Sequence, residues 1–172
     1  MTPAQFLTRA KKKDIPPVIL FLGQEGYNRR RCRDAVAGAL GIEPEQIDMA
    51  ESSLAAVVDD ARAMSLFASE RLIFAKAAET AMPRVSRASA ASSEEDEDGE
   101  ETSGPAGRAA AAGEEALLAA YAKDPTPGVT LIFEAARWDF EGEDKAKTER
   151  VRKFYSAIPE VVEFRRFTAE DA

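Results

Sequence analysis

The residues Gly23 to Arg30 stand where a phosphate-binding loop would be expected. An apolar run ends at Gly23, and a helix-like segment begins near Tyr27. A working phosphate loop needs Gly-x4-Gly-Lys followed by Ser or Thr, because the lysine neutralises phosphate charge and the hydroxyl binds magnesium. This segment reads Gly-Gln-Glu-Gly-Tyr-Asn-Arg-Arg, which lacks both groups and places the Glu25 carboxylate beside the expected phosphates. We therefore predict a tight strand-to-helix turn without a functional nucleotide site.

The other reactive side chains offer little catalytic chemistry. The chain contains no histidine, which removes the commonest general base and the commonest zinc ligand. Cys32 is the single cysteine and falls on a predicted apolar helix face. An acidic group contains Asp139, Glu141, Glu143 and Asp144. Its spacing matches no metal-binding loop, so we expect a solvated loop. We predict no catalytic residue, no cofactor and no metal site.

A second pattern concerns binding. Met64, Leu66 and Phe67 are large apolar residues where a helix should be ending, and the polar residues 69–71 follow them. Two interpretations are open, because these side chains could complete the core or insert into a pocket of another protein. If the helix continued, Leu66 and Phe67 would lie about 80° to either side of its buried stripe. These two are then the better candidates for exposure, and Met64 is the least certain.

Composition and charge limit the class of protein. The 172 residues suffice for one domain, and 45% hydrophobic with 31% charged residues is typical of a soluble globular chain. No apolar run approaches the roughly 20 residues of a membrane helix, and the start resembles no secretory signal, so we expect a cytoplasmic location. The net charge is −8, but seven of the acids lie within 94–101. No broad basic face is expected, and direct DNA binding by this chain is not predicted.

Strands and helices alternate along the chain. Apolar runs predict strands at 17–23, 46–49, 71–75, 129–133 and 161–164. Helical spacing predicts helices at 27–40, 53 to about 64, 114–123 and 144–157. This alternation predicts an α/β fold with a mainly parallel five-stranded sheet flanked by helices. Residues 86–112 are rich in Ala, Ser, Gly and acids, which predicts a disordered insert.

With these elements placed, four segments carry a resemblance to a known family. They are Pro17–Tyr27 with its Gly-x-Glu-x-Tyr turn, Ala63–Phe74 with its Leu-Phe pair, Pro125–Glu134 and Lys153–Phe164. In their order and spacing they resemble the N-terminal domain of the bacterial DNA polymerase III delta subunit, the clamp-loader delta family. The resemblance covers nearly the whole chain apart from 86–112.

The resemblance implies a RecA-like domain of the AAA+ type, a P-loop fold that has lost ATP binding, over residues 1–172. It implies binding to the sliding clamp (the beta subunit) and help in opening this ring for loading onto primed DNA during replication. The family's clamp contacts fall on Met64, Leu66 and Phe67. Further partners would be the gamma/tau and delta prime subunits, with primed DNA held only by the assembled complex. The chain itself would not catalyse, although the holoenzyme is a nucleotidyltransferase in the cytoplasmic, nucleoid-associated replisome.

The sequence departs from the family pattern in two places. The acidic insert is longer than expected, and the chain stops just after Phe167 and Thr168, at residue 172, where the family continues into two helical domains. Those domains include the collar that holds the loader together, so we expect a truncated form of a longer protein. Two alternatives stay open at this stage. One is a nucleotide-binding AAA+ or RecA-like ATPase with a divergent phosphate loop, and the other is a flavodoxin-like scaffold domain.

Overall fold

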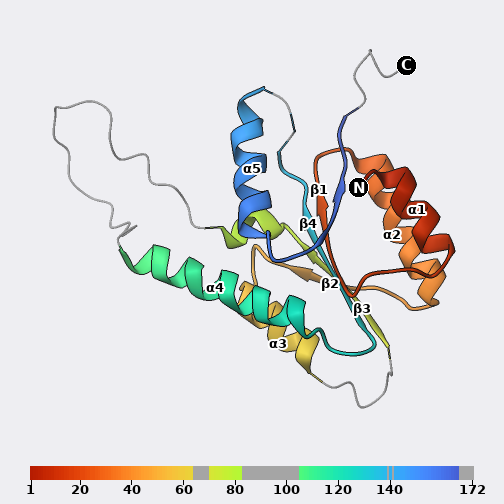
Figure 1. The fold of residues 1–172 in the computed structure, drawn as a ribbon, viewed down its shortest axis with the longest axis horizontal. Helices are drawn as coiled ribbons and strands as arrows, with labels where there is room; N and C mark the ends of the chain where they lie inside the picture. The colour runs from red at the N-terminus through yellow and green to blue at the C-terminus, as the bar shows by residue number, and fades with distance from the viewer. Residues whose placement is uncertain (64–69, 83–104, 139, 141, 167–172) are drawn as a thin grey trace.

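A parallel five-stranded sheet lies at the centre of the molecule (Figure 1). The computed structural model describes residues 1–63, 70–82, 105–138, 140 and 142–166. The strands are β1 (Val18–Leu22), β2 (Glu45–Asp48), β3 (Arg71–Lys76), β4 (Val129–Ala135) and β5 (Glu160–Glu163). Their spatial order is β2-β3-β4-β1-β5, and every neighbouring pair is parallel. The predicted α/β class and five-stranded sheet are confirmed.

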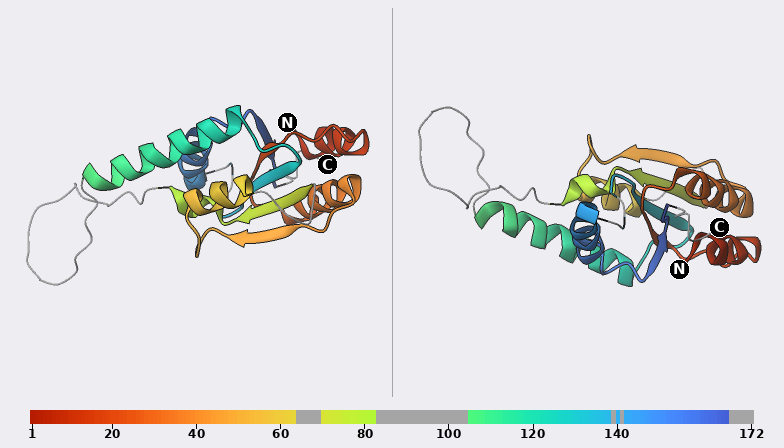
Figure 2. Two further views of the ribbon diagram at one scale, coloured as in Figure 1. Left: turned by 90° about the horizontal axis from the view of Figure 1, so that it is seen from below. Right: turned by 90° about the horizontal axis from the view of Figure 1, so that it is seen from above.

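Helices cover both faces of this sheet, as two further views show (Figure 2). Helices α1 (Pro3–Lys11) and α2 (Gly26–Leu40) lie on one face. Helices α3 (Leu54–Arg62), α4 (Pro105–Lys123) and α5 (Lys145–Phe154) lie on the other. Short 3₁₀ turns, η1 (Ala78–Ala81) and η2 (Gly142–Asp144), complete the connections. A parallel sheet needs cover of this kind because its strands are apolar on both sides.

The side chains of β1 show how two cores arise from one strand. All five residues are buried. Ile19 and Phe21 face the α1/α2 core, whereas the other three face the core beneath α3, α4 and α5. This division follows from the alternation of side chains along a strand. On the α1/α2 face, Phe21 makes edge contacts with Phe6 and Phe164, with ring centroids 5.4 and 5.0 Å apart.

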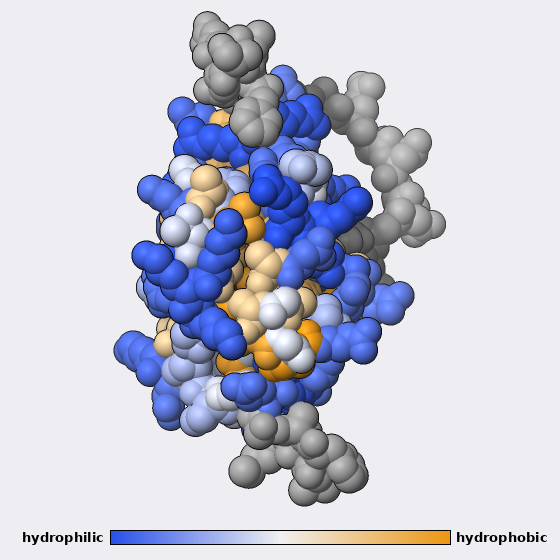
Figure 3. Space-filling model, turned by 90° about the vertical axis from the view of Figure 1, so that its right-hand side faces the viewer, coloured by the Kyte–Doolittle hydropathy of each residue, from blue (hydrophilic) through white to orange (hydrophobic). Residues whose placement is uncertain are grey.

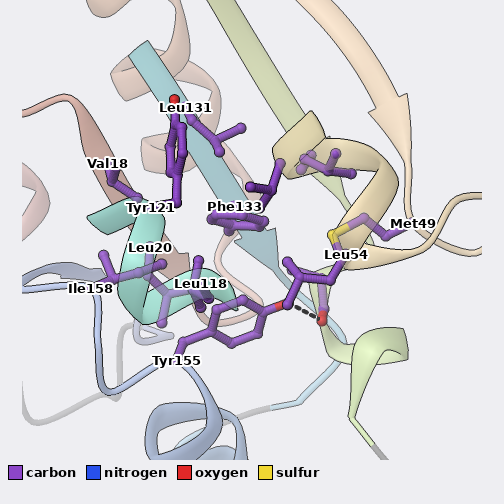
Figure 4. Close-up of a cluster of buried hydrophobic side chains, with 14 of the residues drawn as sticks. Val18, Leu20, Met49, Leu54, Leu118, Tyr121, Leu131, Phe133, Tyr155 and Ile158 are labelled. Atoms are coloured by element: carbon purple, nitrogen blue, oxygen red, sulfur yellow. Dashed lines mark hydrogen bonds between the residues drawn. The ribbon is translucent and has the colours of Figure 1, made fainter. Parts of the chain in front are cut away.

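The larger core contains one buried hydroxyl that is fully paired (Figure 4). Tyr155 lies against Phe133 with ring centroids 5.3 Å apart. Its hydroxyl donates to the carbonyl oxygen of Ala78 at 2.6 Å. Burial raises the pKa of the Tyr155 hydroxyl far above its usual range. The hydrogen bond removes the cost of burying this polar group and ties the end of α5 to η1.

Helix α1 has no counterpart among the predicted elements. Thr2 accepts a hydrogen bond from the backbone of Gln5, the Gln5 side chain accepts one from Thr2, and Pro3 opens the helix. Such a capping box is a recognised start signal. Phe6 and Ala10 are buried one helical turn apart. The start signal of α1 was therefore present in the sequence. Its buried face consists of only Phe6 and Ala10, which is too few apolar residues to give a clear helical periodicity.

Two helix boundaries differ from the predictions. Helix α4 begins at Pro105, so residues 105–112 of the predicted insert are helical. Runs of alanine have the highest helix propensity, and this outweighs the lack of large apolar residues. Helix α3 ends at Arg62 rather than near 64, because Ala63 adopts an extended backbone with ψ at 125°. Within the described residues, no helix is long and apolar enough to cross a membrane.

Candidate functional site

The turn after β1 is closed by a carboxylate at the start of α2. Glu25 is the N-cap residue of this helix, and its two oxygens accept hydrogen bonds from the backbone N–H groups of Tyr27 and Asn28 at 2.7 and 2.9 Å. These N–H groups and the positive end of the helix dipole are what would otherwise attract a phosphate. The protein's own carboxylate therefore occupies the anion position of the would-be phosphate loop.

The backbone of the same turn packs tightly against the neighbouring strands. The N–H of Gly23 donates to Ala135 at 2.9 Å, and that of Glu25 donates to Phe164 at 3.2 Å. The Arg29 guanidinium donates to the carbonyl of Gly23 at 2.9 Å. Gly23 has φ at +122°, and a Cβ there would lie 2.3 Å from the Phe164 oxygen. The turn holds β1, β4 and the end of β5 together, and Gly23 is enclosed by its neighbours.

The cations at this edge of the sheet face a buried internal carboxylate. Glu134 lies near the end of β4 with 5% of its surface exposed. Arg33 forms an ion pair with it at 3.2 Å. Burial raises the pKa of Glu134, while the charges of Arg33, Arg29 and Lys76 lower it in part. The Arg33 charge is thus compensated within the protein.

Removal of the Glu25 cap should destabilise the fold modestly. Replacing Glu25 by Ala leaves two N–H groups of α2 without their acceptor, and we expect a loss of about 1–2 kcal/mol in urea unfolding. Asp34→Ala provides the matched control, because this carboxylate is exposed in the same helix. The control should change stability by less than about 0.5 kcal/mol. Equal losses in both variants would contradict the capping role.

The predicted contact residues Met64, Leu66 and Phe67 lie outside the described residues. The structure does describe the two ends of their segment, which are Ala63 after α3 and Glu70 before β3. Because α3 ends at Arg62, the ranking of these residues by helical phase loses its basis. The segment connects a helix on one face of the sheet to the amino end of β3.

One arginine ties together the elements around this segment. Arg71 makes two hydrogen bonds to the Glu45 carboxylate at 2.9 and 2.6 Å. It also donates to the backbone oxygen and the carboxylate of Asp60, both at 2.8 Å. Its own N–H donates to Gly128 at 2.8 Å. Arg71 thereby fixes α3, β2 and the turn before β4 relative to the start of β3, and it holds the pKa of the Glu45 carboxyl below its usual range.

Sequence reasoning missed this anchor. Glu45 and Asp60 precede Arg71 by 26 and 11 residues. Opposite charges at such separations are common in any sequence and carry no signal by themselves. Only the parallel pairing of β2 with β3 and the packing of α3 place the three side chains at one point.

The other residues singled out in the sequence do not form a site. Cys32 is fully buried, and burial raises the pKa of its thiol to about 12, which makes it a poor nucleophile. Of the acidic group, Asp139 and Glu141 lie outside the described residues. Asp144 forms an ion pair with Lys147 at 3.5 Å. In the part of the chain that the structure describes, no three ligand-type side chains gather to hold a metal ion.

Replacing Arg71 by Met should test whether the base of segment 64–69 matters. We expect a loss of about 1–3 kcal/mol in stability from the missing charged hydrogen bonds. Arg9→Met is the matched control, because Arg9 also bridges two carboxylates, Asp14 and Glu160, on the α1 side of the sheet. If the Arg71 anchor positions segment 64–69, only Arg71→Met should also weaken binding of a partner to that segment. Equal effects of both variants on such binding would contradict this role.

Comparison with known proteins supports the fold. No protein-family model matches the chain, and a search of curated proteins finds no match. Among solved structures, it is similar to the Bacillus subtilis DNA clamp loader delta protein YqeN, with a TM-score of 0.62 and 14% sequence identity. The likeness covers 99% of this chain but 44% of that protein, so the chain spans less than half of its length. At this identity the likeness shows a shared fold, an α/β domain with an all-parallel five-stranded sheet flanked by helices.

Proposed function

We propose that this chain is the clamp-binding domain of a DNA polymerase III clamp-loader delta subunit. It would bind the sliding clamp and help to open the ring for loading onto primed DNA. The observation that carries the proposal is the fold likeness to the Bacillus subtilis clamp loader delta protein over 99% of this chain. The four sequence segments that resemble the delta family support it independently.

The closed turn after β1 favours a mechanical role over nucleotide hydrolysis. Glu25 occupies the helix N-terminus, and Glu134 forms an ion pair with Arg33. A nucleotide would have to displace one carboxylate and would find neither the lysine nor the hydroxyl of a working phosphate loop. ATP-hydrolysing partner subunits would therefore supply the energy, and this domain would contribute binding alone, without a cofactor.

The proposed contact is an apolar insertion by Leu66 and Phe67, with Met64 beside them. Burial of such side chains in a partner's pocket contributes roughly 1.5–3 kcal/mol each, which suffices for a small hot spot. The segment begins after α3 and ends before β3, and Arg71 of β3 joins these two elements through Asp60. A firm base of this kind lowers the ordering cost of binding.

The remaining assignments extend from the same proposal. Residues 1–172 would form one RecA-like domain of the AAA+ type, with an acidic insert before α4. The two helical domains of the family would follow in the whole protein and contact the gamma/tau and delta prime subunits. Primed DNA and membership in the polymerase holoenzyme would then belong to the assembled complex in the cytoplasm.

Two titrations test the proposal against its alternatives. The chain is passed over the immobilised sliding clamp of the same organism in a surface plasmon resonance measurement, and saturable binding is expected. In parallel, labelled ATP with magnesium is titrated into the chain. Micromolar ATP binding would favour the divergent ATPase. Absence of both interactions would favour a scaffold domain and overturn the proposal.

A further inference from the structure

A groove of about 950 Å³ lies between α1, the start of α2 and the end of β5. Its charged lining consists of four cations, Lys11, Arg31, Arg165 and Arg166, and one carboxylate, Glu163. That carboxylate is already shared between Arg152 at 2.5 Å and Arg165 at 2.8 Å. The groove is therefore locally positive in a chain whose net charge is −8. This contrast favours an anionic ligand.

Two of these cations are available for a ligand. Lys11 and Arg31 are exposed, and neither forms an ion pair within the described part of the chain. Arg165 lies over the ring of Phe140, with its guanidinium carbon 4.9 Å from the ring centroid. Arg166 donates to the side chain of Gln24. Arg165 and Arg166, which follow β5, are thus held in place by these contacts. Lys11 lies on α1 and Arg31 on α2.

Part of the groove lining is apolar. Pro3, Ala4 and Leu7 of α1 belong to it, beside the polar residues Thr2, Gln5, Thr8 and Asn28. Figure 3 looks onto the side of the molecule formed by α1 and α2, and an apolar strip runs there between hydrophilic side chains. Such a lining suits a ligand that combines negative charge with apolar groups. Unpaired nucleobases on a phosphodiester backbone have both properties, whereas a duplex keeps its bases inside.

An exposed aromatic residue, Tyr27, immediately precedes the lining residue Asn28. Tyr27 is 70% exposed, the one large apolar side chain in the described residues with such exposure. The guanidinium carbon of Arg31 lies 5.6 Å from the centroid of its ring. Arg31 thus joins Tyr27 to the groove. An aromatic platform next to cations is the arrangement that binds single-stranded nucleic acid without sequence preference.

We propose that this groove binds single-stranded nucleic acid, with phosphates on Lys11 and Arg31 and a base stacked on Tyr27. The proposal stands on the groove and does not depend on clamp binding. The sequence predicted no direct DNA binding because the net charge is −8. That net charge is a sum over the whole chain, so it does not reveal a local basic groove. With two or three phosphates contacted, affinity should fall roughly tenfold between about 50 and 200 mM salt.

The test uses fluorescence anisotropy of a labelled oligothymidine of about 20 nucleotides with the whole chain. We expect saturable binding at low salt, weakened about fivefold or more by Arg31→Glu and by Tyr27→Ala. Tyr27→Phe keeps the ring and should retain binding. Lys123→Glu makes the same charge change at an exposed position on α4, across the sheet, and should have little effect. Thermal melting verifies that each variant is folded.

Several outcomes would overturn the proposal. These are absence of binding at low salt, equal affinity for a duplex of the same length, and equal competition by polyglutamate. An unchanged affinity in folded Tyr27→Ala would also exclude base stacking. Leu66→Ala/Phe67→Ala should leave oligothymidine binding intact. Loss of clamp binding with retained oligothymidine binding, or the reverse, would therefore separate this inference from the proposed function.

Discussion

If this chain binds the sliding clamp as proposed, the double variant Leu66→Ala/Phe67→Ala should lose that binding while its thermal stability stays nearly unchanged. Truncation of two apolar anchors removes roughly 3–6 kcal/mol of burial free energy at the interface. Because 1.4 kcal/mol corresponds to a tenfold change, the dissociation constant should rise by a factor of about 100 or more. Surface plasmon resonance against the sliding clamp measures the affinity, and calorimetry measures the melting temperature.

Matched variants separate interface from core in this experiment. Tyr27→Ala removes a large exposed side chain. Tyr27 follows the carboxyl end of β1, whereas segment 64–69 precedes the amino end of β3, so clamp affinity should not change. Leu118→Ala removes a fully buried leucine and sets the scale for a core loss, about 2–5 kcal/mol. If Leu66→Ala/Phe67→Ala melts as early as Leu118→Ala, the two residues belong to the core. Met64→Ala then shows whether the third side chain contributes to binding.

Replacement of Gly23 by Ala should strongly destabilise the fold. The new Cβ would lie 2.3 Å from the Phe164 oxygen and 2.7 Å from a ring carbon of Phe140. The backbone φ of +122° is also one that side-chain-bearing residues rarely adopt. Backbone strain and overpacking together should cost roughly 2–5 kcal/mol. The melting temperature should fall by about 5–15 °C.

Gly38 supplies a control for this substitution. It lies within α2, and no atom stands within 4 Å of a Cβ added there. Alanine at this position should stabilise the protein by up to about 1 kcal/mol, because glycine disfavours a helix interior. Both variants are measured by urea unfolding. A stability of Gly23→Ala close to that of the parent chain would show that the turn relaxes, and would contradict the tight closure of β1 against β4 and β5.

Some elements could be predicted because their signals are local. The apolar run that became β1 is bounded by Pro17 and Gly23, and α2 ends at Gly41 in the left-handed conformation that favours glycine. The defective phosphate loop is equally local, since it depends on missing residue types. The end of α3 was misplaced because apolar residues continue past Arg62 although the helix does not. Periodicity reports which residues are apolar and does not report where the backbone turns.

By itself, the sequence determined the α/β class, the five strands and the lack of a working phosphate loop, because each depends on residue types within a short window. The tertiary structure decided the rest. It brought Glu45 and Asp60 to Arg71. It also gathered basic residues from α1, α2 and the end of β5 into one groove. These contacts join residues far apart in the chain, and only the strand order and helix packing fix which of them meet.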